Sequence, residues 1–574
     1  MHDALTTLKY DNSFELETLY KLIETPSNSE LGDYAIPCFI FSKIIRKSPH
    51  QISQQLSQII HDMGNNNTDI ITSINALGPY INFHISKDYM ASITLPQIVN
   101  GRYFSNNRSS KKERIMIEYS QPNTHKGFHV GHIRNVALGD SLCRIYRYNG
   151  YDVVSANYIG DVGSHIAKCL WYYLNHNTEP IPEYFKGEWL GTLYTKATLK
   201  LANDPPEKVK KYNEEISKIL QKLENRDPEL QTIWKETRQW SLKDFEEIYE
   251  WLDNKFDVVF YESEFDESGK KLILEYLQKG VFERSEGAIG IDLNDVDLRY
   301  FLLLKSDGNT LYSTKDIVLG IKKFDEFKID RSIYIVGAEQ TLHFQQVFET
   351  LKRMGYHQAE KCFHLVYSLV VLPSGKMSSR TGNIILFSKL RDEIIQYVRN
   401  NYLNEYEGKW SESEIEKTTK RIAVAAIKYG MLKQSTNQNI VFSMKDWLKT
   451  QGDTGVYLIY VYVRIRSILK KVNIELRTDV DFRLLSHPNE KLLIRQLYDF
   501  NEIVLRAGKQ YGPSLLTTFL YEMAKTFNRV YKECSVVRAS SDELQFARLL
   551  LFYCVAEILK QGLYLLGITP PERM

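Results

Sequence analysis

The spacing of apolar residues changes along the chain and divides it into three regions. In the first region, residues 50–63 place Ile52 and Leu56 on one face of an expected helix. Residues 80–85 instead alternate between apolar and polar positions, as a strand with one buried face does. We therefore expect residues 1–105 to form a small α+β domain.

The middle region alternates short apolar runs with helical segments, which is the order of a parallel βαβ unit. The pattern predicts a buried strand at 114–120, a helix at 132–148 and a second strand at 152–158. We expect a Rossmann-like, doubly wound parallel sheet in residues 106–400, interrupted by a charged helical insertion at about 170–256. In such sheets the ligand lies at the carboxyl ends of the strands.

From residue 401 onward the pattern is helical throughout. Wide apolar stripes recur at helical spacing in four segments, namely 422–432, 456–469, 515–530 and 546–565. Stripes of this kind bury their apolar face against one another, so residues 401–574 are predicted to form an all-α helix bundle.

Composition narrows the class of protein. The 574 residues are 43% hydrophobic and 25% charged, which is typical of globular proteins, and no apolar run is long enough to cross a bilayer. The net charge is only +2, although residues 401–574 carry 25 Lys and Arg against 19 Asp and Glu, a tilt compatible with a polyanionic partner. The six cysteines form no C-x-x-C pair, and the first residues contain no export signal, so we expect a cytoplasmic protein with reduced thiols.

The first candidate for a functional site is the stretch between the strand predicted at 114–120 and the helix predicted at 132–148. His129 and His132 flank Gly131 where this helix is expected to begin. A helix N-terminus offers free N–H groups and a positive dipole end to an anion, and imidazoles donate hydrogen bonds to phosphate oxygens. Because glycine has no Cβ, a flat base can approach the backbone there. The stretch predicts a nucleotide triphosphate site.

A second polar stretch, residues 375–382, follows the apolar run 365–372. It is bounded by glycines and carries Lys376 together with the hydroxyls of Ser378 and Ser379. A cationic loop of this kind is suited to closing over phosphates as charge develops on them.

These two stretches resemble the HIGH and KMSKS motifs of class I aminoacyl-tRNA synthetases. The surrounding residues are similar to those of arginyl-tRNA synthetases, and the resemblance extends from Gly32 to the last residue. The segments that carry it are Pro122-Asn123, Lys126, His129 to His132, Tyr312 to Asp316, Gly337 to Gln340 and Pro571 to Met574.

The resemblance implies an arginine–tRNA ligase. Such an enzyme activates L-arginine with ATP, releases pyrophosphate, and transfers arginine to the 2′-hydroxyl of the terminal adenosine of tRNA(Arg). In that family the N-terminal domain rests on the elbow of the tRNA, the helix bundle holds the anticodon, and activation needs bound tRNA. The family also implies a monomer.

The resemblance assigns roles to thirteen residues of this chain. The catalytic set is His129, His132, Lys376 and Lys126, and the ATP site is His129, Gly131, His132, Lys376, Met377, Ser378 and Ser379. The arginine site is Glu118, Asn123, Tyr312, Asp316 and Gln340. Mg²⁺ is expected on the phosphates of ATP, although no carboxylate cluster in the sequence predicts a dedicated protein metal site.

Side-chain chemistry is compatible with the arginine site. A guanidinium is a planar, permanently charged fork that carboxylates hold best, so Asp316 and Glu118 would take it while Tyr312 bonds to it or stacks on it. Lysine lacks the fork and would leave acceptors unsatisfied. Asn123 and Gln340 would fix the α-amino and α-carboxylate groups.

Two other readings stay open. Small-molecule nucleotidylyltransferases share the His-x-Gly-His arrangement, and a synthetase-like chain without catalysis could bind only tRNA or arginine.

One departure from the family concerns the segment 454–460, in which Val456 and Ile459 stand where the family usually has proline and glutamine. A tRNA contact through that glutamine is therefore not expected here.

Overall fold

A computed structural model describes residues 2–7, 16–26, 31–63, 69–105, 113–373, 384–472 and 475–574, together with the backbone of residues 375 and 376. The chain divides into two compact units. The first comprises residues 1–103, 472–500 and 526–555, and the second comprises residues 104–471, 501–525 and 556–574.

The N-terminal part of the first unit packs helices on a three-stranded antiparallel sheet. The strand order is β1-β3-β2, with β1 at Tyr34–Pro37, β2 at Ile71–Leu77 and β3 at Tyr80–Ile85. The helices are α1 (His2–Thr7), α2 (Leu16–Lys21), α3 (Phe39–Ile45), α4 (Pro49–Met63) and α5 (Lys87–Val99). Ile52 and Leu56 are fully buried in their core, as the spacing of apolar residues predicts.

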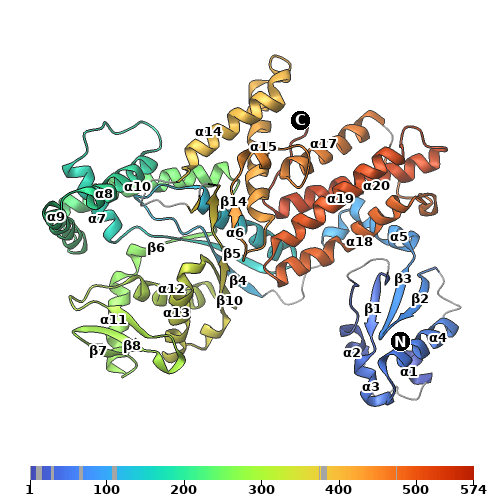
Figure 1. The fold of residues 1–574 in the computed structure, drawn as a ribbon, viewed down its shortest axis with the longest axis horizontal. Helices are drawn as coiled ribbons and strands as arrows, with labels where there is room; N and C mark the ends of the chain where they lie inside the picture. The colour runs from blue at the N-terminus through green and yellow to red at the C-terminus, as the bar shows by residue number, and fades with distance from the viewer. Residues whose placement is uncertain are drawn as a thin grey trace. The chain divides into compact units, whose positions relative to one another are not determined.

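A five-stranded parallel sheet forms the centre of the second unit (Figure 1). Its order is β11-β10-β4-β5-β6, with β4 at Arg114–Glu118, β5 at Asp152–Ile159, β6 at Val258–Tyr261, β10 at Arg331–Gly337 and β11 at Cys362–Tyr367. Numbered along the chain, this is the 3-2-1-4-5 order of a Rossmann-like, doubly wound sheet. The order reverses between β4 and β10, where ligands bind in such folds.

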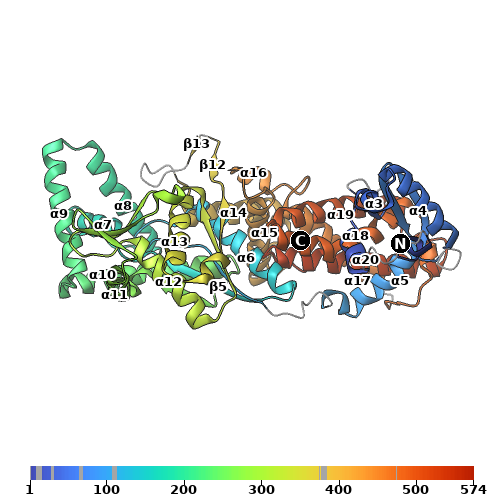
Figure 2. The ribbon, with the colours of Figure 1, turned by 90° about the horizontal axis from the view of Figure 1, so that it is seen from below.

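Helix α6 (Val130–Tyr148) connects β4 to β5 and is buried along most of its length. The predicted insertion then appears as four helices that gather into one cluster (Figures 1 and 2), namely α7 (Ser164–Asn175), α8 (Lys186–Asn203), α9 (Pro206–Glu224) and α10 (Pro228–Trp251). A second cluster between β6 and β11 contains α11 (Asp266–Gln278), β7 (Glu283–Ser285), β8 (Ala288–Asp292), β9 (Tyr300–Leu304), α12 (Tyr312–Phe327) and α13 (Thr341–Arg353).

After β11, the described residues form helices and one small sheet of order β13-β12-β14. Its strands are β12 (Val370–Leu372), β13 (Gly375–Lys376) and β14 (Ile440–Val441). The helices are α14 (Phe387–Val398), α15 (Glu412–Leu432), α16 (Met444–Trp447), α17 (Gly455–Val472), α18 (Pro488–Lys509), α19 (Pro513–Glu533) and α20 (Asp542–Leu565). The last three helices contribute residues to both units.

The fold class predicted from the sequence is confirmed, and the individual bounds shift by a few residues. The first strand ends at Glu118 and not at residue 120, because Ser120 and Gln121 adopt left-handed backbone angles that no strand accommodates. The helix that follows begins at Val130, two residues before its predicted start.

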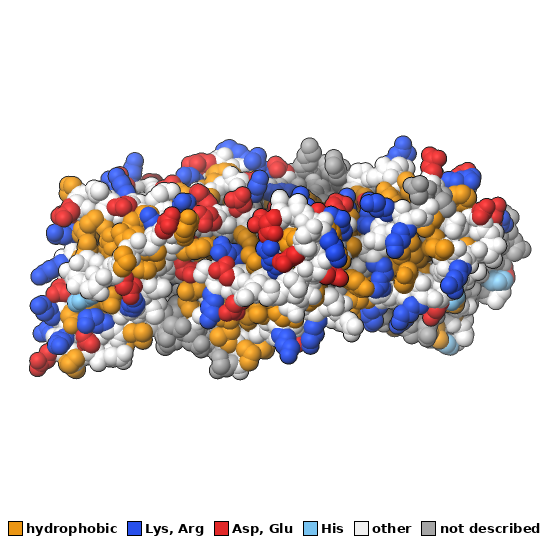
Figure 3. Space-filling model, turned by 90° about the horizontal axis from the view of Figure 1, so that it is seen from above, with side chains coloured by type: hydrophobic (Ala, Val, Ile, Leu, Met, Phe, Trp, Pro, Cys, Tyr) orange, Lys and Arg blue, Asp and Glu red, His pale blue; other side chains and the backbone are white. Residues whose placement is uncertain are grey.

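The surface mixes charges of both signs. Figure 3 shows Lys and Arg interspersed with Asp and Glu and with apolar side chains over the face that it presents. Within the described part of the chain, no helix combines the length and the apolarity that crossing a membrane requires.

Candidate active site

The loop between β4 and α6 has an unusual backbone. Ser120, Gln121 and His125 have φ angles of 79°, 47° and 60°, in the left-handed region that residues other than glycine rarely adopt. Side chains from neighbouring elements hold the loop there. The N–H of Ser120 donates to Oδ1 of Asn135 at 2.9 Å, and the N–H of Gln121 donates to Oδ1 of Asn157 at 3.1 Å.

His125 ties the same loop to the insertion. Its N–H donates to Oγ of Ser241 on α10 at 3.0 Å, and its Nε2 lies 2.8 Å from Oγ1 of Thr237. Burial lowers the pKa of His125 to about 3, so this imidazole is neutral. It serves as an anchor of the loop and differs in this from the two histidines that follow.

His129 and His132 lie against each other at the N-terminus of α6, with ring centroids 3.9 Å apart. The N–H of Gly131 donates to Nδ1 of His129 at 3.1 Å, and the N–H of His129 donates to Nδ1 of His132 at 3.1 Å. Because each Nδ1 accepts a hydrogen bond, each neutral ring carries its proton on Nε2. Both rings are therefore set to donate from Nε2 to an anion.

The protonation of this pair follows from its burial. Burial lowers the pKa of His129 to about 4, and burial together with the neighbouring His129 and Lys126 holds the pKa of His132 well below its ordinary value. At neutral pH the rings are hydrogen-bond donors without charge. The ammonium of Lys126 lies 5.4 Å from the ring centre of Tyr194.

Most of the predicted lysine loop, including Met377, Ser378 and Ser379, lies outside the described residues. Of Lys376 only the backbone is described, and it pairs with Val371 between β13 and β12. The segments that flank the loop both contact the beginning of α6. The N–H of Val130 donates to the carbonyl of Ile385 at 3.0 Å, and the guanidinium of Arg134 donates to the carbonyl of Ser368 at 2.6 Å.

A cavity of about 1280 Å³ opens at the carboxyl ends of β4 and β10. All five residues of the predicted arginine site line it: Glu118, Asn123, Tyr312, Asp316 and Gln340. Its other walls include residues of α7, α9, α10, α11 and α13, the end of β5 with the loop that follows it, and the loop before α12. His129, His132 and Lys126 are not among the lining residues, although Lys126 and His129 belong to the loop that supplies Asn123 and His132 lies in the first turn of α6.

Asn123 reaches this cavity beside a glycine. The carbonyl of Gly160, just after β5, accepts from the N–H of Thr124 at 2.9 Å. A Cβ on Gly160 would lie 2.4 Å from Oδ1 of Asn123, so a side chain there would displace the amide. The loop and the end of β5 thus meet at the cavity wall.

The two carboxylates predicted for the guanidinium both have partners within the protein. Oε2 of Glu118 lies 2.5 Å from Nζ of Lys323, and its Oε1 accepts from Nε2 of Gln121 at 2.9 Å. Oδ2 of Asp316 lies 2.5 Å from Nε2 of His343. Neither partner could be predicted from the sequence. Tyr312, by contrast, is 62% exposed at the first turn of α12.

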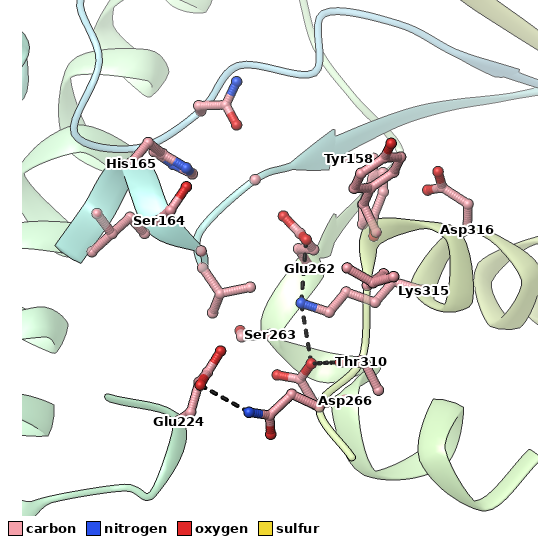
Figure 4. Close-up of a pocket in the computed structure, with 18 of the residues that line it drawn as sticks. Tyr158, Ser164, His165, Glu224, Glu262, Ser263, Asp266, Thr310, Lys315 and Asp316 are labelled. Atoms are coloured by element: carbon pink, nitrogen blue, oxygen red, sulfur yellow. Dashed lines mark hydrogen bonds and ion pairs between the residues drawn. The ribbon is translucent and has the colours of Figure 1, made fainter. Parts of the chain in front are cut away.

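A further charged cluster, formed by Lys315, Glu262 and Asp266, also lines the cavity (Figure 4). The ammonium of Lys315 lies 3.2 Å from Oε1 of Glu262 and 3.1 Å from Oδ1 of Asp266, and Figure 4 shows it between the two carboxylates. Burial raises the pKa of Glu262 to about 7, although Lys315 opposes the shift. The charge of Glu262 therefore changes in the neutral pH range.

Asp161 is a buried residue that joins the insertion to the sheet. Its carboxylate accepts from Nε of Arg238 at 2.7 Å and from both the N–H and the hydroxyl of Ser263 at 2.8 Å. The sequence offered only the pattern Gly-Asp-Val-Gly as a signal. Asp161 therefore links α10 to Ser263, the residue that follows Glu262.

No group of three or more His, Cys, Asp and Glu side chains in the described ranges is arranged to hold a metal ion. Three carboxylates of the cavity, Glu118, Asp316 and Glu262, are paired with lysine or histidine, as described above. These donors do not form a protein cage for Mg²⁺.

Comparison with known proteins gives a consistent family. Residues 94–444 match the family model of the catalytic domain of "tRNA synthetases class I (R)", which is more than half of the chain. Residues 458–574 match the "DALR anticodon binding domain", and residues 2–85 match the "Arginyl tRNA synthetase N terminal domain". An arginine–tRNA ligase of Bdellovibrio bacteriovorus is 40% identical over 100% of this chain and 98% of its own length.

The chain belongs to the arginyl-tRNA synthetase family. An arginine–tRNA ligase of Clostridium botulinum is 34% identical, covering 99% of this chain and 98% of the relative. The structure of the Thermus thermophilus arginyl-tRNA synthetase has a TM-score of 0.80 at 24% identity and covers 100% of this chain and 98% of that one. The Plasmodium falciparum enzyme has a TM-score of 0.77 at 24% identity, covering 96% and 94%. These two structures show the shared fold.

The two positions that depart from the family pattern are buried. Val456 and Ile459 are both fully buried in α17. Apolar residues at these positions belong to the core of the helix bundle, so Ile459 offers no surface to a polyanion.

Proposed function

We propose that the cavity is the arginine-activation site of an arginine–tRNA ligase. The observation that carries this assignment is that one stretch of chain, from the end of β4 to the start of α6, contributes to two features. One is the cavity that contains all five residues of the predicted arginine site, and the other is the imidazole pair at the N-terminus of α6. Family membership makes arginine and tRNA(Arg) the substrates that fit.

In the first reaction, the carboxylate of arginine attacks the α-phosphorus of ATP in line, and pyrophosphate leaves. The nucleophile is the substrate itself, so no covalent enzyme intermediate forms and the protein contributes positioning and charge stabilisation. Nε2–H of His129 and of His132 donates to the α- and β-phosphate oxygens, with Gly131 under the adenine. Their Nδ1 bonds to backbone N–H groups keep this tautomer fixed.

The cations of the site neutralise the phosphates. Lys376, with Met377, Ser378 and Ser379 of the same loop, contacts the leaving pyrophosphate, and Lys126 adds a cation near the imidazoles. Mg²⁺ would be held by the phosphates of ATP, since no group of three or more acidic, His or Cys side chains in the described ranges is arranged to hold it. It supplies additional charge neutralisation when bound.

The other end of the cavity recognises arginine. Asp316 takes the guanidinium beside Tyr312, and Asn123 with Gln340 fixes the α-amino and α-carboxylate groups. Glu118 lies on the floor of this site with its charge balanced by Lys323, so it contributes an acceptor without adding net charge to the cavity. Lysine lacks the planar fork and leaves lone pairs of Asp316 unsatisfied.

In the second reaction, the 2′-hydroxyl of the terminal adenosine of tRNA(Arg) attacks the carbonyl of arginyl-adenylate, and AMP leaves. The proposed roles divide along the chain. The elbow of the tRNA contacts residues 1–105, residues 106–400 catalyse the reactions, and the anticodon contacts residues 401–574. A monomeric state and a cytoplasmic location stay predictions.

Arginine-dependent ATP–pyrophosphate exchange, measured with and without tRNA(Arg), tests the assignment. We expect exchange with arginine and none with lysine, together with formation of arginyl-tRNA(Arg). Exchange that needs no amino acid would indicate a nucleotidylyltransferase. Binding of tRNA or arginine without exchange or aminoacylation would indicate a chain that has lost catalysis.

A further inference from the structure

The partner of Asp316 is the observation that extends the proposed function. Asp316 on α12 and His343 on α13 both line the cavity, and Nε2 of His343 lies 2.5 Å from Oδ2 of Asp316. Their side chains are only 17% and 10% exposed. A carboxylate accepts hydrogen bonds, so Nε2 of His343 carries a proton and donates it.

Packing fixes the imidazole in this position. The ring centres of Tyr312, Phe344 and Phe301 lie 4.9, 5.4 and 5.7 Å from that of His343. Its other nitrogen, Nδ1, is buried and has no hydrogen-bond partner in the described ranges. The hydrogen bond to Asp316 is thus the polar contact of the His343 ring in the described ranges.

This contact affects how the carboxylate meets a guanidinium. A bidentate guanidinium–carboxylate pair requires the plane of the carboxylate to face the fork, and a free aspartate side chain rotates. The hydrogen bond from His343 takes one side of Oδ2, holds the plane and leaves Oδ1 and the second lone pair of Oδ2 for the substrate. Tyr312, proposed to lie beside the guanidinium, packs on the same imidazole.

We propose that His343 is a positioning residue that orients Asp316 for the guanidinium and so sets the affinity for arginine. This rests on the proposed function, in which Asp316 contacts the substrate. An ordinary structural role would require His343 only as a packed ring between α12 and α13. The two roles differ in whether the N–H of the ring matters.

Three variants separate these roles by steady-state aminoacylation of tRNA(Arg). His343→Phe keeps an aromatic ring and removes the donor, whereas His343→Gln keeps an amide N–H the same number of bonds from the backbone. We expect His343→Phe to raise the arginine KM about tenfold with kcat changed less than twofold, because a hydrogen bond to a charged group is lost. His343→Gln should stay within threefold of wild type, and so should the control His357→Gln at an exposed histidine.

A double variant keeps the proposal testable if the phenylalanine disturbs packing. If His343 acts through Asp316, then adding His343→Phe to Asp316→Asn should leave the arginine KM of Asp316→Asn unchanged. Additive effects, or equal KM values for the phenylalanine and glutamine variants, would overturn the proposal. If Asp316→Asn itself leaves the arginine KM at the wild-type value, the proposed function of Asp316 fails, and this outcome is distinct from a failure of His343 alone.

Discussion

Replacing Lys323 by methionine tests how the buried acidic floor of the cavity is stabilised. Lys323 is fully buried, its ammonium lies 2.5 Å from the carboxylate of Glu118, and it also lies 3.7 Å from the ring centre of Tyr334. Removing one partner of a buried ion pair costs about 3–5 kcal/mol, because the remaining charge is left without compensation. The hydrogen bond from Gln121 to Glu118 remains, so we expect the lower end, about 3 kcal/mol.

Hydrogen–deuterium exchange measures this loss in peptides that cover β4, which carries Glu118, and β10, the strand paired with it. A loss of about 3 kcal/mol makes exchange through opening of these strands roughly a hundredfold faster. Lys322→Met is a matched control on the same helix, since Lys322 pairs with Glu326 at 3.8 Å near the surface and such pairs contribute about 0–1 kcal/mol.

A second variant tests the cause of the effect. Glu118→Gln combined with Lys323→Met removes both charges, and we expect most of the protection to return, because a neutral pair carries no uncompensated charge. Equal exchange in Lys323→Met and Lys322→Met would refute the reasoning. So would a double variant that exchanges as fast as Lys323→Met.

Three further outcomes are expected. Asp316→Ala should raise the arginine KM about 10- to 100-fold, measured by aminoacylation, because a charge-assisted hydrogen bond is lost; an unchanged KM would remove Asp316 from the arginine site. Lys376→Ala should lower the rate of ATP–pyrophosphate exchange about 100-fold or more while the arginine KM stays nearly constant, and normal turnover would exclude this lysine from the chemistry. The pKa of His129 is lowered to about 4 from an unfolded value of 6.5, so the unfolded chain binds more protons between these values and His129 makes stability fall as the pH drops from 6.5 toward 4. Urea unfolding at pH 5, 6 and 7 should therefore show a steeper loss on acidification in wild type than in His129→Gln, and parallel curves would contradict the assigned burial.

The elements around the cavity could be predicted from the sequence because local signals specify them. Apolar runs predicted the strands β4 and β5, and helical spacing predicted α6 and the insertion. Tyr312 and Asp316, which the family resemblance assigned to one site, stand four residues apart in α12, and both line the cavity. These signals depend on residues that are close together in the sequence.

The partners of the acidic residues could not be predicted in the same way. Lys323 lies in the middle of α12, where a lysine is expected on the solvent-exposed face of the helix. In the structure it is fully buried against Glu118. His343 lies 27 residues after Asp316, on another helix. Such pairs depend on how β4, α12 and α13 pack, and no periodicity in a single sequence encodes that packing.

The left-handed residues of the β4–α6 loop have a consequence for tolerance to mutation. Ser120, Gln121 and His125 each hold a backbone conformation that costs on the order of 1–3 kcal/mol. The amides of Asn135 and Asn157 hold Ser120 and Gln121 in this conformation. Loss of either amide would let the backbone relax and shift the histidines that follow, so the site is sensitive to mutation at two side chains that do not line the cavity.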